Sequence, residues 1–332
     1  MKKSIPTFVL AVIATAALSA CGGDSGDSNT SPSSPAAISS SNQESVAHAA
    51  VVGGLSIAQV QSASSGGTLA TASSALGRVH SLFAGGQARR FVASAMAASA
   101  RPAAVSTDTE PCAFAGTITS TFDDRDGNNV LSVGDVITVA FSQCSDQTGS
   151  SIDGTMTITT TSVTSDTQFA ATVGLAHLTA VNGALTAALD GAMSLAELDT
   201  ETQSQTTLSV GTSGLTATIA SSSYNDTITY AQGFTVAETD DSTSGSSTAT
   251  ISGTLSATSI GGTVTLATPQ PVVAFFDDDF ASSGQLSVTG ANGSKLLLTV
   301  IDATQVREQL DANGDGAYES DTTELWTTLV PS

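Results

Sequence analysis

The sequence predicts a mainly β protein: a large antiparallel meander, arranged as a curled sheet, an open barrel or a sandwich, with a short Ala-rich helical segment N-terminal to it. The first observation is a period-two alternation from residue 112 onward, where Ile137, Val139 and Phe141 alternate with smaller or polar residues. Such one-sided alternation indicates strands with one buried face and one solvated face. The second observation is that short polar turns separate about a dozen strand-like segments, a pattern typical of all-β folds.

A specific turn supports the antiparallel arrangement. Asn292-Gly293 lies between two strand-like segments, Gln285–Thr289 and Lys295–Ile301. This residue pair accepts the positive φ angles that a tight hairpin requires, so we predict a β-hairpin here. A sheet of this size must curl, pack on a second sheet or be covered by helices, because its apolar face and its edges need protection.

The first residues have the pattern of a secretory signal peptide. Lys2 and Lys3 precede an uncharged run, Ile5–Ala20, that ends in small residues. A transmembrane helix is the alternative, but this run is shorter than the ~20 residues that span a bilayer. We therefore assign residues 1–20 to a cleaved signal peptide and expect the chain to be exported.

Cleavage would place a cysteine at the new N-terminus. Leu18-Ser19-Ala20-Cys21 resembles the lipobox of bacterial lipoproteins. The resemblance implies lipidation of Cys21: its sulfur takes a diacylglyceryl group as a thioether, and the freed amine is acylated as well. Two or more buried acyl chains anchor a protein stably, at ~0.8 kcal/mol per methylene group. In that family Asp after the cysteine retains a protein at the inner membrane. Because Gly22 stands here, we expect an outer-membrane lipoprotein of the bacterial cell envelope, with the membrane as a partner through the N-terminal lipid.

The remaining chain divides into three parts. Residues 21–44 are rich in Ser, Gly, Asn and Pro and predict a flexible tether. Residues 45–108 form an Ala/Ser-rich, partly helical segment, in which the spacing of apolar residues predicts an amphipathic helix over Ser73–Ala100. A partly disordered spacer is the alternative for this segment. Residues 109–332 form the antiparallel β domain.

The chain is strongly acidic, with 30 Asp and Glu against 9 Lys and Arg and a formal net charge of -21. After Cys112 the basic residues are Arg125, Lys295 and Arg307. A polyanionic surface repels nucleic acid and anionic lipid head groups, so we expect no nucleic-acid partner. Such a surface attracts cations, although solubility alone explains most of these carboxylates.

The cysteine content fits an exported protein. Three cysteines are present, and assigning Cys21 to the lipid leaves Cys112 and Cys144. In an oxidising compartment we expect these two residues to form a disulfide. Two free buried thiols are the alternative.

Two Asp-rich loops are candidate calcium sites. The first, Asp124–Asp135, resembles the twelve-residue calcium loop of EF-hand type. Calcium takes roughly six to eight hard oxygen ligands, and alternate positions of a tight loop direct them inward. Asn129 replaces the usual turning glycine, and the closing acid is Asp rather than Glu. The expected ligands are Asp124, Asp126, Asn128, Val130 through its carbonyl, Ser132 and Asp135.

The second loop, Asp311–Glu319, keeps the turning glycine at Gly316. Thr322 holds the closing position, so Asp321 or Glu324 would have to substitute for it. The expected ligands are Asp311, Asn313, Asp315, Ala317 and Glu319. For both loops the alternative is a solvated Asp/Asn-Gly turn that needs no metal.

Taken with these loops, residues 112–328 resemble a group of uncharacterised bacterial lipoproteins. The segments that carry the resemblance are Asp124–Asp135 before a second cysteine, Gly290–Lys295, Asp311–Glu319 and Trp326. The group has no assigned activity, so the resemblance implies the architecture and nothing about a reaction.

The sequence contains no recognisable catalytic motif, neither a Gly-x-Ser-x-Gly elbow nor a His-Glu-x-x-His zinc motif nor a phosphate loop. The histidines, His48, His80 and His177, are scattered, and His177 falls on the apolar parity of its strand, which predicts a core histidine. Asp277-Asp278-Asp279 predicts a charged turn anchored by the neighbouring phenylalanines.

Three function classes remain. The first is a tethered envelope protein that works by binding or by structure and is stabilised by calcium. The second is a periplasmic carrier that holds an apolar ligand in a half-barrel. The third is a hydrolase, the weakest of the three, so we expect no enzyme. A filled concave face favours the first class, whereas an apolar cavity of ~300 Å³ or more favours the carrier.

Overall fold

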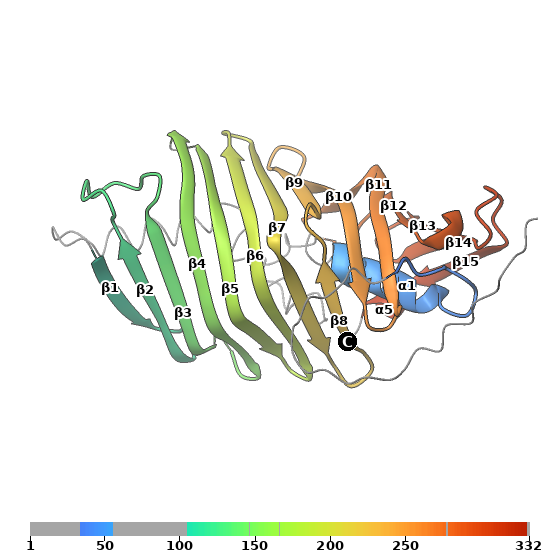
Figure 1. The fold of residues 1–332 in the computed structure, drawn as a ribbon, viewed down its shortest axis with the longest axis horizontal. Helices are drawn as coiled ribbons and strands as arrows, with labels where there is room; N and C mark the ends of the chain where they lie inside the picture. Colours follow the sequence, from blue (N-terminus) through green and yellow to red (C-terminus); the bar gives the residue numbers. More distant parts are fainter. Residues whose placement is uncertain (1–33, 56–104, 146, 166, 277, 331–332) are drawn as a thin grey trace, which may run out of the picture. The chain divides into compact units, whose positions relative to one another are not determined.

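A computed structural model describes residues 34–55 and 105–330, apart from residues 146, 166 and 277. These residues form one antiparallel sheet of 15 strands (Figure 1), which confirms the predicted fold class. Neighbouring strands follow the order of the chain, except that β8 and β9 share the place between β7 and β10.

The strands are β1 (Val105–Pro111), β2 (Ala115–Asp123), β3 (Val136–Ser145), β4 (Ser150–Ser165), β5 (Gln168–Asn182), β6 (Leu185–Asp199), β7 (Gln203–Ala220), β8 (Asn225–Tyr230), β9 (Thr235–Asp241), β10 (Ser246–Ala257), β11 (Gly262–Phe275), β12 (Ser283–Thr289), β13 (Lys295–Val300), β14 (Gln305–Asp311) and β15 (Ser320–Leu325). The helical elements are α1 (Gln43–Ala50), its π-helical continuation η1 (Val51–Leu55), a short 3-10 turn η3 (Ala291–Gly293) and α5 (Trp326–Leu329).

The predicted hairpin is confirmed. Asn292 and Gly293 have φ angles of 56° and 78° in the turn between β12 and β13, and Thr289 pairs with Lys295 at the hairpin end. The positive φ values explain why this residue pair occurs here.

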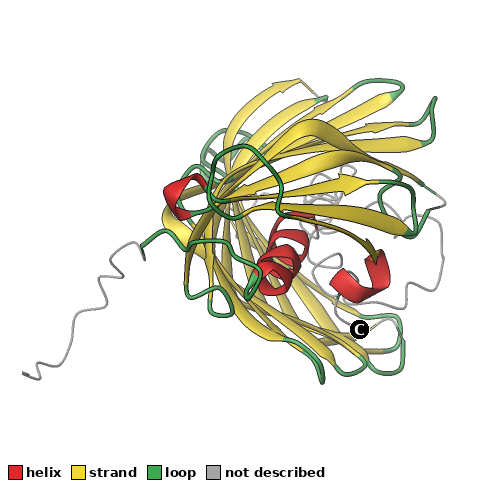
Figure 2. Ribbon diagram, turned by 90° about the vertical axis from the view of Figure 1, so that its right-hand side faces the viewer, coloured by secondary structure: helices red, strands yellow, loops and turns green. Residues whose placement is uncertain are grey.

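β-Bulges bend the sheet. Between Leu175 and Leu178, β5 has one residue more than β6, and His177 has a φ angle of 49°. A Cβ atom at Gly154 on β4 would lie 2.3 Å from the His177 carbonyl oxygen, so glycine is required opposite this bulge. Similar register shifts occur between β2 and β3, β6 and β7, and β10 and β11. Because each bulge bends its strand and increases its twist, the sheet curves, and Figure 2 shows it curving around α1.

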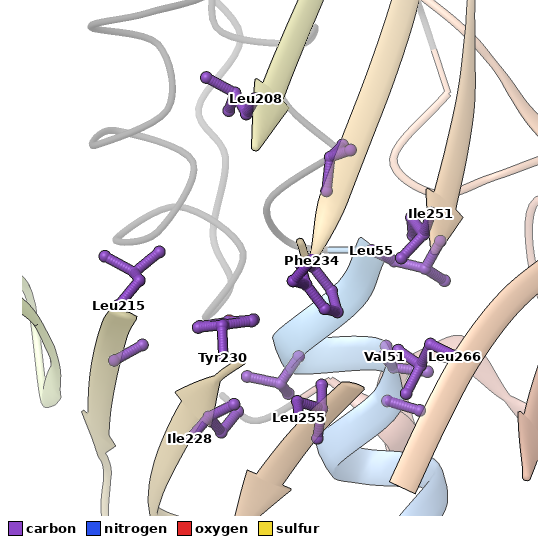
Figure 3. Packing of buried hydrophobic residues seen from close by; sticks show 14 of the residues in the cluster. Val51, Leu55, Leu208, Leu215, Ile228, Tyr230, Phe234, Ile251, Leu255 and Leu266 are labelled. Atoms are coloured by element: carbon purple, nitrogen blue, oxygen red, sulfur yellow. The ribbon is translucent and has the colours of Figure 1, made fainter. Parts of the chain in front are cut away.

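The concave side of the sheet is filled where α1 and η1 lie against it. Ala47, Ala49 and Ala50 are fully buried, since small side chains let the helix approach the strands closely. A Cβ atom at Gly53 would lie 3.2 Å from side-chain carbons of both Ile228 and Leu255. The Tyr230 hydroxyl donates to the Gly53 carbonyl at 2.9 Å. Figure 3 shows Val51 and Leu55 of η1 among apolar side chains of β8, β10 and β11, namely Ile228, Ile251, Leu255 and Leu266.

The described part of the predicted tether packs on the sheet. Pro35 forms a parallel bridge with Thr263, and the Ala36 amide donates to the Thr263 carbonyl at 2.9 Å. Ile38 is 1% exposed and its amide donates to Ser294 Oγ. The prediction of a flexible tether up to residue 44 is therefore wrong for residues 34–44. The reason is that the apolar side chain of Ile38 finds a place in the core.

Two of the segments predicted from the sequence lie outside the residues that the structure describes. The amphipathic helix predicted over Ser73–Ala100 lies outside the described residues, as does the signal peptide with Cys21. Within residues 34–55 and 105–330, no helix has both the length and the apolar character needed to cross a membrane.

The C-terminal helix α5 is held by its tryptophan. Trp326 is 1% exposed, its ring stacks on Phe280 with centroids 5.9 Å apart, and its indole N–H donates to the Asp302 carbonyl. Phe280 therefore anchors one end of the acidic turn that contains Asp278 and Asp279, whereas Phe275 before the turn is 45% exposed, so the predicted aromatic anchor is confirmed for Phe280 and wrong for Phe275.

Candidate metal sites

The first Asp-rich loop connects β2 to β3 and turns three carboxylates toward one another. Asp124 is 4% exposed and Asp135 is fully buried, because they flank the ends of the two paired strands. One carboxylate oxygen from each of Asp124, Asp126 and Asp135 lies within 4.8 Å of the others. Ser132 joins this cluster, since its hydroxyl donates to Asp126 Oδ2 at 2.8 Å and to Asp135 Oδ2 at 3.0 Å.

The second loop connects β14 to β15 and forms a similar cluster. One carboxylate oxygen from each of Asp311, Asp315 and Glu319 lies within 4.8 Å of the others. Asp311 is 4% exposed at the end of β14, whereas Asp315 and Glu319 are exposed. The closing acid predicted from the sequence is different: Asp321 is not in the cluster and pairs instead with Arg307 on β14. Glu319 closes the loop instead, because its carboxylate accepts a hydrogen bond from the amide of Ala312, seven residues earlier.

The two loops share one hydrogen-bond framework. The first aspartate of each, Asp124 or Asp311, accepts hydrogen bonds from the amides three and five residues later. The closing acid accepts from the amide of the second residue, as Asp135 does from Arg125 and Glu319 from Ala312. The side chains at positions three and five accept from the amide two residues on, in the pairs Asp126–Asn128, Asn128–Val130, Asn313–Asp315 and Asp315–Ala317. These bonds direct side-chain oxygens toward the interior of each loop.

The first loop has asparagine, not glycine, at its sixth position. Asn129 has a φ angle of 59°, and Gly316 at the equivalent position of the second loop has one of 89°. Asparagine tolerates this left-handed conformation better than most residues with a side chain. The Asn129 substitution is therefore compatible with the loop geometry.

Hydrogen bonds within the first loop favour the ionised state of Asp124. Burial by itself raises the pKa of Asp124, but hydrogen bonds from the amides of Asn129 and Gly127 outweigh it and hold that pKa below its usual range. Arg125 lies beside the cluster, yet its guanidinium pairs with Asp123, with Nε 3.4 Å from Asp123 Oδ2. Three acidic side chains thus share a small volume, an arrangement that attracts a cation.

The expected ligands without a carboxylate are Asn128, Val130, Asn313 and Ala317, besides Ser132. Val130 and Ala317 occupy the seventh position of the two loops, and the Val130 side chain is 59% exposed. Their amides donate to Asn128 Oδ1 and Asp315 Oδ1. The structure therefore brings together the carboxylates and Ser132, and it assigns Asn128 and Asn313 to the hydrogen-bond framework.

The predicted disulfide is confirmed. Cys112 lies in the turn before β2, Cys144 lies near the end of β3, and their Cα atoms are 5.5 Å apart. The bond closes the end of the β2–β3 pair where Ala115 faces Ser145, opposite the end that carries the first Asp-rich loop. The hairpin is thus fastened at both ends.

His177 is not a core residue, so this prediction is wrong. Its side chain is 91% exposed, its backbone amide donates to Asp190 Oδ1, and Nδ1 lies 3.1 Å from the same oxygen. The β5 bulge adds one residue, which switches the buried parity from Leu175 to Leu178 and turns His177 outward.

A second polar centre, which the motifs in the sequence do not predict, lies at the start of β8. Asp226 is 1% exposed and accepts hydrogen bonds from the hydroxyls of Tyr224, Thr258 and Ser259 and from the Ser259 amide. The available signal was parity, because Asp226 occupies the buried alternation of Ile228 and Tyr230.

Comparison of the chain with protein-family models, with curated proteins and with solved structures finds no match in any of the three.

Proposed function

We propose that this chain is a lipid-anchored protein of the bacterial cell envelope, with a binding or structural role, whose sheet is stabilised by calcium at two loops. The observation that carries the calcium part is the pair of carboxylate clusters, each with oxygens within 4.8 Å of one another. The anchor part is supported by the Leu-Ser-Ala-Cys motif that ends at Cys21. The proposed partner is the membrane, reached through the lipid on that residue.

Calcium fits the clusters better than other common ions. Every side chain in them offers oxygen, the ligand type that hard cations require, and none offers the sulfur or imidazole that zinc prefers. The second cluster is exposed at Asp315 and Glu319, so water can complete a large and irregular shell there. Magnesium demands a smaller octahedral shell and releases water reluctantly, which makes it the weaker candidate.

The position of α1 supports a scaffold more than an apolar-ligand carrier. Where α1 and η1 lie on the concave side, Val46, Val51, Val52 and Leu55 are at most 2% exposed. Figure 3 shows Val51 and Leu55 beside apolar side chains of the strands. The chain's own side chains fill this part of the curve, where a carrier of the half-barrel type would need an empty apolar space.

Adding calcium should raise the melting temperature. Extracellular calcium modules bind with dissociation constants of ~0.1–1 mM, so about 1 mM calcium adds roughly 0.4–1.4 kcal/mol per site through RT ln(1 + [L]/Kd). For a domain of this size the expected rise is a few degrees, measured by circular dichroism in chelator and then in calcium.

Asp126→Ala should remove the contribution of the first loop to this rise, and Asp315→Ala should remove that of the second. Asp279→Ala removes an exposed acid outside both clusters and should keep the full shift. Identical melting curves in chelator and in about 10 mM calcium would show that both loops are metal-free turns.

Replacing Cys21 should release the protein from membranes. Cys21→Ala removes the sulfur that would carry the diacylglyceryl group, and without two or more acyl chains stable anchoring is lost. Fractionation followed by a high-salt wash should find the variant in the soluble fraction, while Ser25→Ala, outside the motif, stays in the membrane pellet. Recovery of Cys21→Ala in the washed pellet would contradict the anchor.

A further inference from the structure

We propose that a pocket beside α1 binds a small, neutral, polyhydroxylated compound of sugar type. The pocket has a volume of about 480 Å³ and lies between α1, the turn that leads from β7 into β8, the turn between β10 and β11, and α5. This volume is within the ~300–1,000 Å³ that small-molecule sites occupy. Figure 2 shows α1 and α5 close to each other on the concave side of the sheet.

The lining presents uncharged hydrogen-bonding groups from four separate segments. Hydroxyl groups and one amide predominate, contributed by Ser45, Ser223, Asn225, Ser259, Thr327 and Thr328. Hydroxyls both donate and accept hydrogen bonds, and an amide side chain offers one group of each kind. A ligand with many hydroxyls can match such a wall at several points, whereas an apolar ligand would leave these groups unsatisfied.

An aromatic pair forms the rest of the wall. The His48 ring of α1 stacks on the Tyr224 ring, with centroids 5.8 Å apart and planes inclined by 29°. Both residues line the pocket, and each is partly exposed. Flat rings beside polar groups provide an apolar surface for the C–H face of a sugar ring, while the hydroxyls at its edge reach the surrounding side chains.

Asp226 holds this side of the pocket in place. The Tyr224 hydroxyl donates to Asp226 Oδ2 at 2.9 Å, and the Ser259 amide donates to Oδ1 at 3.1 Å. The hydroxyls of Thr258 and Ser259 add two further hydrogen bonds. One buried carboxylate therefore ties the β7–β8 turn to the β10–β11 turn. Residues fixed before binding lose little conformational entropy when a ligand arrives, which raises the affinity.

The charges around the pocket favour a neutral ligand. Among the described residues of the lining, Glu44 is the one acidic residue; its side chain is 83% exposed, and Oε1 lies 3.9 Å from His48 Nε2. An anion would meet this acid and a chain with a net charge of -21. A cation would find Asp226 already engaged by four donors and covered from solvent.

Saturation-transfer NMR on the purified full-length protein tests this inference, with glucose and maltose as probes. Signal transfer to at least one of these neutral sugars is expected, with a dissociation constant in the range of about 1 mM. Glucuronate and glucosamine, the anionic and cationic counterparts, should give weaker transfer. If neither neutral sugar receives signal, or if a charged counterpart binds more tightly, the assignment of ligand class is wrong.

Two matched substitutions locate the binding. Thr328→Tyr places a large side chain in the pocket from an exposed position on α5 and should weaken sugar binding at least about tenfold. Thr322→Tyr makes the same change at an exposed position on β15 outside the pocket and should leave binding intact. Ser223→Tyr places the same side chain in the pocket from the turn between β7 and β8, so it replaces Thr328→Tyr if that variant fails to fold by circular dichroism. Equal binding by a folded blocking variant and by Thr322→Tyr would place the sugar elsewhere and overturn the proposal. The pocket shares no residue with the calcium loops, so this result is independent of calcium binding.

Discussion

Replacing Cys112 and Cys144 together with serine is expected to lower the free energy of unfolding by about 4 kcal/mol. The two cysteines are 32 residues apart in sequence, and a cross-link over that distance removes much of the conformational freedom of the unfolded chain. Urea unfolding of the oxidised protein and of the double variant measures the difference. Adding dithiothreitol should lower the urea midpoint of the unsubstituted protein and leave that of the double variant unchanged.

The loss should be greatest at one edge of the sheet. β1 pairs only with β2 among the described strands, and the disulfide joins the turn between them to β3. Hydrogen exchange in β1 and β2 should therefore accelerate first, whereas the β12–β13 hairpin should change less. If the double variant has the same urea midpoint as the oxidised protein, the disulfide does not contribute to the free energy of unfolding.

The sequence predicts the fold well because the physical signal is local. The alternation of Ile137, Val139 and Phe141 reports which face of β3 is buried, and all three are at most 6% exposed. The Asn292-Gly293 turn depends on φ angles that few other residue pairs accept, so its hairpin can be predicted from two residues.

The bulges and the position of the N-terminal segment cannot be predicted in the same way. A bulge adds one residue to a strand without any change of composition, and it reverses the parity on which the core prediction for His177 rested. Three serines, Ser39–Ser41, follow Ile38 in sequence, and Ser294, which accepts the hydrogen bond from its amide, is 256 residues away. Neither effect has a signal within a short window of sequence.

The candidate metal sites fall between these cases. The alternation of oxygen-bearing residues predicts the cluster of Asp124, Asp126 and Asp135, because the loop is short and its ends are fixed by paired strands. The second loop departs from the expected spacing because Arg307 on the neighbouring strand β14 pairs with Asp321 and holds it outside the cluster. A contact across two strands decides which acid closes the loop.

Glu238 is an acidic residue at a position where the alternation along β9 predicts a buried apolar one. It lies on β9 in the buried alternation that begins with Val236 and is 4% exposed. Glu197 on β6 is also buried, and both residues pair in register with Thr206 of β7, which lies between them. Burying a carboxylate is costly in its charged form, so such a residue makes stability depend on pH.

Glu238→Gln is expected to remove a large loss of stability between mildly acidic and alkaline pH. Burial, with a smaller contribution from the nearby charge of Asp240, raises the pKa of Glu238 to about 8, against the opposing effect of the hydrogen bond donated by Ser247. A raised carboxyl pKa means that the folded state holds a proton that the unfolded state has released, so stability is greatest below the ordinary value of 4.5 and falls until pH 8.

Each pH unit in that window costs up to about 1.4 kcal/mol, which gives a total on the order of 5 kcal/mol from this residue. Asp226, Asp241, Asp302 and Asp321 have lowered pKa values, so their contributions change below 3.8 and outside the window. Burial also raises the pKa of Glu308, so this residue acts in the same direction as Glu238 and leaves a residual dependence of stability on pH in the variant.

These contributions are separated by urea unfolding at intervals from pH 4 to pH 9. The proteins compared are the unsubstituted protein, Glu238→Gln and the exposed control Glu201→Gln. Glutamine keeps the shape of the side chain and the acceptor for Ser247 without the charge, so the variant should be the most stable of the three at pH 9. Parallel stability curves for all three proteins would mean that Glu238 carries no proton in the folded state at neutral pH.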